Sequence, residues 1–280
     1  MKPIGIVVLL CCIVVSGSAW AQILPVGFGL TPRAIGMGTA AVGMADDAGA
    51  WFENPAGLAA LNVPVAEGQQ WGHDVVAAYA DLPGTTAWGG SYSGFNPTKH
   101  FGVGLGGASI DDAMTLLGGG AGIGIGHTGL SVGVCVVNLD PDVGSDHTIL
   151  DAGLMYLAPQ PGKPPVRLGV RVTDLTDETH VGPFYNIGIA WPVTPDLLVA
   201  FDVVDLSDEI DTVVNGGAEY RFGTAKEFAF RAGFMDPQGP AIDTRLTLGV
   251  GYRVSNWRVD VGWVSLPSDD IWSAGVGANF

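Results

Sequence analysis

The chain has little charge, few basic residues and almost no cysteine. Asp, Glu, Lys and Arg make up only 14% of its 280 residues, and 12 Lys and Arg stand against 28 Asp and Glu, a net charge of −16. A chain with so few basic residues lacks the positive surface that binds phosphate backbones, which excludes nucleic acid as a partner. At 48% hydrophobic, the composition also excludes disorder.

Glycine and apolar residues are present in excess instead. The chain contains 43 glycines, roughly twice the usual share, which is about 7%. A chain this apolar needs either a very large core or a solvent other than water.

The N-terminus has the pattern of an export signal. Lys2 precedes an apolar run from Ile4 to Val15, and Ala19-Trp20-Ala21 forms a small-residue cleavage site. We predict that residues 1–21 are a cleaved signal peptide; the alternative is an N-terminal membrane anchor. Cleavage leaves one cysteine, Cys135, so the mature chain has no intramolecular disulfide and no cysteine-based zinc site.

Short alternating segments fill the rest of the chain. The mature sequence has no run of 18 apolar residues, whereas after Leu61 apolar residues recur at every second position between Gly, Pro, Asn and Asp clusters. We therefore predict an all-β protein: an antiparallel transmembrane β-barrel over residues 62–280. About fourteen strands are expected, at 73–80, 85–92, 101–109, 117–126, 130–138, 148–157, 166–174, 184–191, 197–204, 212–222, 227–235, 244–253, 257–265 and 271–280.

Three features favour a membrane barrel over a soluble β-sandwich or propeller. The face opposite the apolar one is small or charged, as in a lumen. Aromatics gather at strand ends in two sets, as in lipid-embedded barrels. The chain ends in a strand whose terminal Phe280 resembles the signal for barrel insertion. The aromatic sets are Tyr92, Trp191, Phe222, Phe228 and Trp257, and Trp88, Tyr185, Trp263 and Trp272; the expected lumen charges are Asp151, Arg167, Arg171, Asp202, Glu219, Arg221, Arg231, Arg245, Arg253 and Asp260.

Acidic residues are concentrated in alternate connections. If the last strand ends in the periplasm, the outer connections hold 17 of the 28 acids and no Lys or Arg, whereas Lys99, Lys163 and Lys226 fall in inner turns. One interpretation is that these loops are acidic because they are solvated. The alternative is that a cluster such as Asp140, Asp142 and Asp146 binds a divalent cation through oxygen ligands. No metal site is assigned.

Residues 22–61 do not alternate, and we predict that they form a plug inside the barrel, facing the glycine-rich strands 101–126. Asn54 before Pro55 is typical of a helix start, because an Asn side chain caps the helix and Pro suits its first position. Asp46 and Asp47 could begin another short turn. Small residues dominate, which suits a confined space.

The plug also resembles a known family. Its motif residues match the N-terminal signature of PorV/PorQ-type proteins in the wider FadL-like outer-membrane superfamily: Arg33, Gly36, Met37, Gly38, Asp46, Asp47, Asn54, Pro55, Ala56 and Gly57. The resemblance covers about 30 residues and implies a plugged outer-membrane barrel without a cofactor. In that family, such barrels admit hydrophobic compounds or serve protein secretion and surface attachment.

The sequence predicts a barrel that passes or gates small, including hydrophobic, solutes; the alternative is a non-conducting barrel that binds a secreted or envelope protein. Other partners are membrane lipid and the barrel-insertion machinery. A charged lumen argues against fatty-acid uptake, because a hydrophobic ligand needs an apolar pocket. No catalytic set is apparent, so we expect no enzyme. The glycines of Gly102-x-Gly104-x-x-Gly107 lie within a strand, which argues against nucleotide binding.

Overall fold

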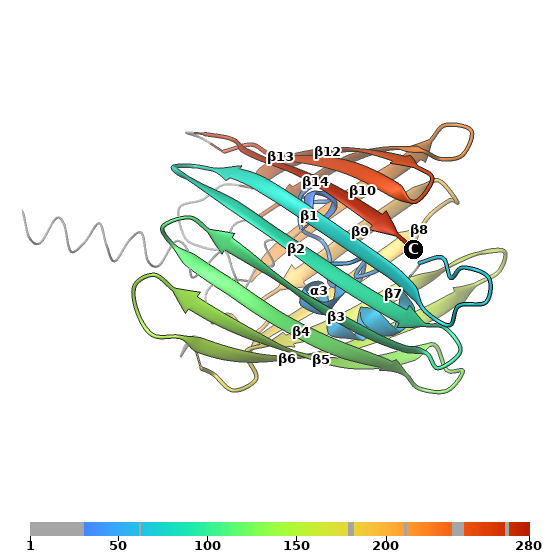
Figure 1. Cartoon of the computed structure of the whole chain (residues 1–280), viewed down its shortest axis with the longest axis horizontal. Coiled ribbons are helices and arrows are strands. Elements are labelled where there is room, and N and C mark those ends of the chain that lie inside the picture. The colour runs from blue at the N-terminus through green and yellow to red at the C-terminus, as the bar shows by residue number, and fades with distance from the viewer. Residues whose placement is uncertain (1–30, 62, 179–181, 210–211, 237–243, 267–268) are drawn as a thin grey trace, which may run out of the picture.

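A computed structural model of the chain describes residues 31–61, 63–178, 182–209, 212–236, 244–266 and 269–280. In these residues, strands pair antiparallel with their sequence neighbours, and β1 pairs with β14 to close one barrel (Figure 1). The predicted fold class is confirmed, and each predicted strand corresponds to an observed one. The strands are β1 Gly72–Leu82, β2 Thr85–Asn96, β3 Phe101–Ile110, β4 Met114–Gly124, β5 Leu130–Pro141, β6 His147–Gln160, β7 Lys163–Thr173, β8 Phe184–Pro192, β9 Leu197–Val204, β10 Val213–Phe222, β11 Phe228–Met235, β12 Arg245–Val254, β13 Trp257–Val264 and β14 Ile271–Asn279.

The alternation places apolar side chains on the outside of the barrel. In β5, Val134 and Val136 are 54% and 48% exposed, whereas Cys135 and Val137 between and beside them are buried. Large apolar side chains are exposed in this way along most of the strands. Monomeric soluble proteins rarely expose so much contiguous apolar surface, and its natural solvent is a bilayer.

Aromatic side chains border this surface at both ends. Phe222, Phe228 and Tyr252 lie in ring contact at the end that holds the C-terminus, with centroids 5.4 and 5.0 Å apart. Trp263 and Trp272 lie 6.3 Å apart at the opposite end. Both groups belong to the two aromatic sets expected from the sequence, apart from Tyr252.

The acidic connections lie at the barrel end opposite Phe280, which we call the acidic end. This follows from the antiparallel order; Asp211 and Asp243 lie outside the described residues. Two of these connections repeat one turn, Asp174-Leu-Thr-Asp177 and Asp205-Leu-Ser-Asp208, in which the last Asp N–H bonds the first Asp carbonyl at 3.0 Å. All four aspartates have positive φ, which Asp tolerates better than most residues. In the described residues, no group of three His, Cys, Asp or Glu is arranged to hold a metal.

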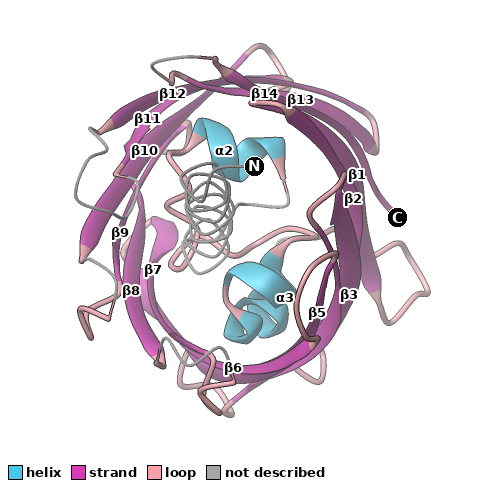
Figure 2. Cartoon of the chain, turned by 90° about the vertical axis from the view of Figure 1, so that its left-hand side faces the viewer, coloured by secondary structure: helices cyan, strands magenta, loops and turns pink. Residues whose placement is uncertain are grey.

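The N-terminal segment lies inside the barrel (Figure 2). It contains α2 (Pro32–Gly36), α3 (Ala50–Glu53) and the 3₁₀ helix η1 (Pro55–Ala60), and we call residues 31–61 the hatch. The predicted signal peptide and residues 22–30 lie outside the described residues. Among the described helices, none is long and apolar enough to cross a membrane.

Candidate functional site: the hatch and the divided lumen

Side-chain caps and a proline start two of the hatch helices. The Asn54 side chain accepts a hydrogen bond from the Ala56 N–H at 3.2 Å, with Pro55 at the first helical position, as the sequence predicts. Thr31 caps α2 in the same way before Pro32, a start that the sequence analysis missed. The sequence analysis expected Asp46 and Asp47 to begin a short turn. The Asp47 side chain does accept a hydrogen bond from the Gly49 N–H, whereas the Asp46 side chain pairs with Arg33.

Glycines of the wall leave the space that the hatch fills. Gly102, Gly122, Gly133 and Gly153 lie directly opposite one another across β3 to β6. A Cβ on Gly122 would lie 2.5 Å from the Pro55 carbonyl oxygen, closer than atoms pack. The prediction that the plug faces strands 101–126 is too narrow, because glycines from β5 to β8 and from β10 to β14 also meet hatch atoms.

Two hatch glycines of the signature meet the opposite wall. Gly36 lies against Gly249 of β12, where a Cβ on Gly36 would be 2.9 Å from the Gly249 Cα. Gly38 has a φ of +67°, a backbone conformation that a residue with a Cβ rarely adopts. Met37 between them is fully buried with Met44, Ala190 and Ala200. Gly36, Met37 and Gly38 of the motif therefore allow the hatch backbone to pack closely against the barrel wall.

A continuous ion-pair network joins the hatch to the wall. Arg33 contacts Asp46 at 2.5 Å and Asp47 at 3.2 Å within the hatch, and Glu219 of β10 at 3.1 Å. Further pairs extend it on both sides, so that five arginines meet five carboxylates. Those pairs are Arg167–Asp46, Arg221–Glu219, Arg231–Glu219, Arg231–Asp260, Arg258–Asp74 and Arg258–Asp260.

The network keeps its hatch members charged. Burial on its own would raise the pKa of Asp46, but the guanidinium groups of Arg33 and Arg167 lower it to about 2. Burial would likewise lower the pKa of Arg33, and the charges of Asp46, Glu219 and Asp47 raise it well above its ordinary value. Because all these groups are largely buried, losing one partner would leave an uncompensated charge.

Two more contacts tie the hatch to the wall. Arg171 of β7 pairs with Asp151 of β6 at 2.5 Å, and its guanidinium lies 5.2 Å from the ring centre of Phe52. Asp202 of β9 accepts a hydrogen bond from the Val42 N–H at 2.8 Å. Arg171 is therefore paired with a neighbouring acid, as predicted for the lumen arginines, whereas Asp202 is held by a backbone N–H of the hatch.

One hatch carboxylate has no such partner. Glu53 is 3% exposed, and among the described residues neither of its carboxylate oxygens has a hydrogen-bond partner. Burial raises its pKa well above the ordinary value, and the nearby charge of Asp47 raises it further. The sequence contains no signal that separates this glutamate from an exposed one.

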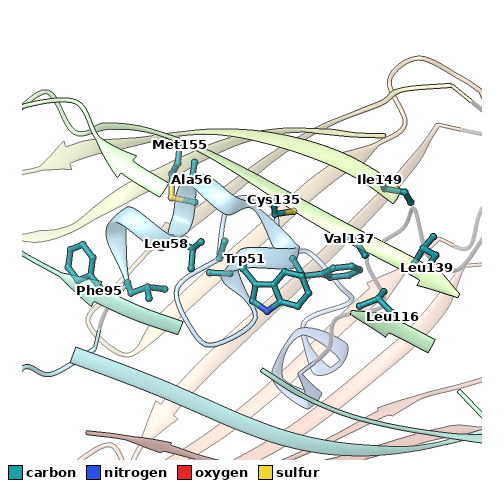
Figure 3. Close-up of a cluster of buried hydrophobic side chains, with 14 residues drawn as sticks. Trp51, Ala56, Leu58, Phe95, Leu116, Cys135, Val137, Leu139, Ile149 and Met155 are labelled. Atoms are coloured by element: carbon teal, nitrogen blue, oxygen red, sulfur yellow. The ribbon is translucent and has the colours of Figure 1, made fainter. Parts of the chain in front are cut away.

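The lumen is not charged throughout, which corrects the expectation from the sequence. Trp51, Phe52 and Leu58 of the hatch form a buried apolar cluster with lumen-facing residues of β4 to β6, including Leu116 and Val137 (Figure 3). The Trp51 Nε1–H donates to the Ser91 Oγ at 2.5 Å. Alternation alone could not identify these residues, because in β4 and β5 both faces carry apolar side chains.

Within the described part of the chain, cavities of differing chemistry flank the hatch. An apolar cavity of about 610 Å³, partly open to solvent, lies towards the acidic end between Ile35 and Phe52 of the hatch and small residues of β1 to β3. Two charged cavities of about 650 and 660 Å³ lie towards the C-terminal end. Arg33, Asp46 and Arg221 line both of these. The hatch thus divides an apolar chamber from a charged vestibule.

The remaining predicted residues form no ion pair of the network within the described part of the chain. Arg245 and Arg253 face the lumen from the two ends of β12, and within the described residues no carboxylate pairs with either. Phe280 stacks on His73 of β1 at 5.2 Å, at the seam where the barrel closes. The sequence analysis missed Arg258 and Asp74. Arg258 alternates with Asp260 and could have been found from that spacing.

A closed antiparallel barrel with an apolar outer face, aromatic borders and a polar interior defines the class of transmembrane β-barrel proteins. Within the described residues, this barrel also holds the hatch, which ion pairs join to the wall.

Among the compared structures, one barrel supports the fold. No protein-family model matches the chain, and no curated protein matches it. The toluene transporter TbuX of Ralstonia pickettii is similar in structure, with a TM-score of 0.56 and 16% identity over 89% of this chain and 97% of that one. The outer membrane protein Omp33 of Acinetobacter baumannii has a TM-score of 0.48 and 13% identity, and a mutant porin of Rh. blastica 0.47 and 12%, each over 75% of this chain and 97% and 99% of theirs.

Proposed function

We propose that the protein is an outer-membrane barrel that admits small, including hydrophobic, solutes into its apolar chamber, and that the hatch limits their passage. The chamber between Phe52, Ile35 and the small side chains of β1 to β3 carries this proposal, because a concave apolar cavity is the usual binding site for such solutes. The export signal, Phe280 and the apolar outer face support the location. The PorV/PorQ resemblance of the hatch motif is part of the proposal.

A specific observation also favours the alternative, a non-conducting barrel that binds a secreted or envelope protein. The hatch occupies glycine spaces around much of the wall and is held by buried ion pairs. Such a hatch could close the lumen permanently.

Swelling of liposomes that contain the purified protein distinguishes the two. We compare the intact protein with Arg33→Gln, which breaks the hatch–wall pairs, and with Lys226→Gln as the matched control, whose pair with Asp196 is exposed. If solutes pass through the barrel, liposomes with the intact protein should swell slowly, and those with Arg33→Gln should swell faster. Lys226→Gln should swell at the rate of the intact protein. No swelling with any variant, together with one stoichiometric partner cross-linked in membranes, would support the alternative.

The chamber itself is tested by filling it. Ala80 of β1 lines the chamber, whereas Ala77 of the same strand is exposed on the outer face. Ala80→Phe should reduce the uptake of a small apolar solute and Ala77→Phe should not. Equal uptake by both variants would refute the chamber as the entry site.

A further inference from the structure

One arginine of the vestibule forms no ion pair with any described residue. The five arginines and five carboxylates of the network balance each other, but Arg253 of β12 lines the same cavity and is not among the pairs. Within the described part of the chain, no hydrogen bond or ion pair of its guanidinium is found. Arg253 is also exposed to the cavity, so its charge can be reached by a soluble molecule.

The acids near Arg253 are engaged in other contacts. The charges of Arg221, Arg258 and Arg33 act on it as like charges, and Glu219 is the acid that opposes them. Glu219 is already shared by Arg33, Arg221 and Arg231. Asp46, Asp47, Asp74 and Asp260 also line this cavity, and each pairs with another arginine. Glu227, a further acid of the lining, accepts a hydrogen bond from the Ala225 N–H at 2.8 Å.

Other basic groups of this cavity are engaged. Arg258 donates two hydrogen bonds to Asp74, at 2.6 and 3.0 Å, and Lys226 pairs with Asp196 at 2.6 Å. Arg221 contacts Glu219 through Nε and Nη2, yet its side chain is still 31% exposed. Arg253 and the partly exposed Arg221 both line this cavity of about 650 Å³, so both guanidinium groups are available to a bound anion.

We propose that this vestibule binds a soluble oxyanion, a carboxylate or a phosphate group, through Arg253 with Arg221 assisting. A guanidinium presents paired N–H donors that match two oxygens of either group. Binding would give the Arg253 guanidinium the ion pair that the other arginines of this cavity already have. The site lies on the side of the hatch away from the apolar chamber, so the inference goes beyond the proposed passage of solutes and does not require the barrel to conduct.

Thermal unfolding of the full-length protein in neutral detergent tests this site, with inorganic phosphate and benzoate as probes and chloride at equal ionic strength as reference. Wild type should gain stability with at least one probe beyond chloride, and the two arms distinguish phosphate from carboxylate. Arg253→Gln should need at least tenfold more probe for the same gain. Arg245→Gln, on the same face of β12 but outside the vestibule, should respond like wild type.

The midpoint without probe separates a binding role from a structural one. Because Arg253 faces like charges, Arg253→Gln should unfold at the same temperature as wild type or higher. A lower midpoint would mean that Arg253 holds the fold through a contact, which overturns the proposal. No gain beyond chloride in wild type, or an equal loss of response in both variants, would overturn it as well.

Discussion

Adding one methyl group at Gly122 should displace the hatch without touching its charges. A Cβ at this position would lie 2.5 Å from the Pro55 carbonyl oxygen, whereas ordinary contact begins near 3.4 Å, so the start of η1 must retreat by roughly 0.9 Å. Overpacking of this kind costs about 1–3 kcal/mol. The neighbours Gly102 and Gly133 hold the same segment, so it has little room to move sideways.

Gly90→Ala is the matched control for Gly122→Ala. Gly90 lies in β2, where the nearest atom to an added Cβ is the Val76 carbonyl oxygen at 3.3 Å. Its stability should change by no more than about 1 kcal/mol, and an increase is possible because alanine restricts the unfolded chain. Denaturant unfolding measures both changes, and hydrogen exchange of residues 55–60 reports the hatch itself. Equal stability and equal exchange in the two variants would refute the close fit of hatch to wall.

Three further changes test individual hatch contacts. Arg33→Gln should cost about 3–5 kcal/mol in denaturant unfolding, because it leaves buried carboxylates unpaired; a cost below about 1 kcal/mol would show that the network is solvated. Asn54→Ala should cost about 1–2 kcal/mol through loss of the cap, and faster hydrogen exchange confined to η1 is the expected signature. For Glu53, the folded pKa lies above the unfolded value of 4.5, so the folded state binds more protons and stability falls as pH rises from about 4.5 through the raised pKa. Glu53→Gln should remove that fall and be the more stable protein at neutral pH; an unchanged pH profile would contradict the buried, unpartnered carboxylate.

Asp46 gives a second pH window with the opposite sign. Its folded pKa of about 2 lies below the ordinary 3.8, so its contribution is present above 3.8 and is lost as pH falls through about 2. The intact protein should therefore lose hatch stability in strong acid, and Asp46→Asn should lose it already at neutral pH.

The barrel could be predicted because its physical constraints repeat in the sequence. The strands of a closed sheet alternate between lipid and lumen, and Arg245 to Arg253 of β12 show that period without interruption. The cap of η1 was also predictable, since Asn-Pro acts over two residues. Contacts between distant segments were not: the pairing of Arg33 with Glu219 joins residues 186 positions apart.

The division of the lumen was hidden for a similar reason. In β5, Val134 faces outward and Val137 inward, and both are valines, so composition does not distinguish lipid from lumen. Glu53, the last residue of α3, likewise looks like any solvent-exposed glutamate until the hatch surrounds it. Such features depend on how the hatch fits the wall, which only three-dimensional contacts reveal.

The conductance of single barrels in a planar lipid bilayer tests the central claim, that residues 31–61 obstruct the lumen. The intact protein should show low conductance, and Arg33→Gln should open to larger steps because its hatch is no longer held to β10. Lys226→Gln should behave like the intact protein. A wide, steady conductance in the intact protein that none of the hatch variants changes would contradict the account.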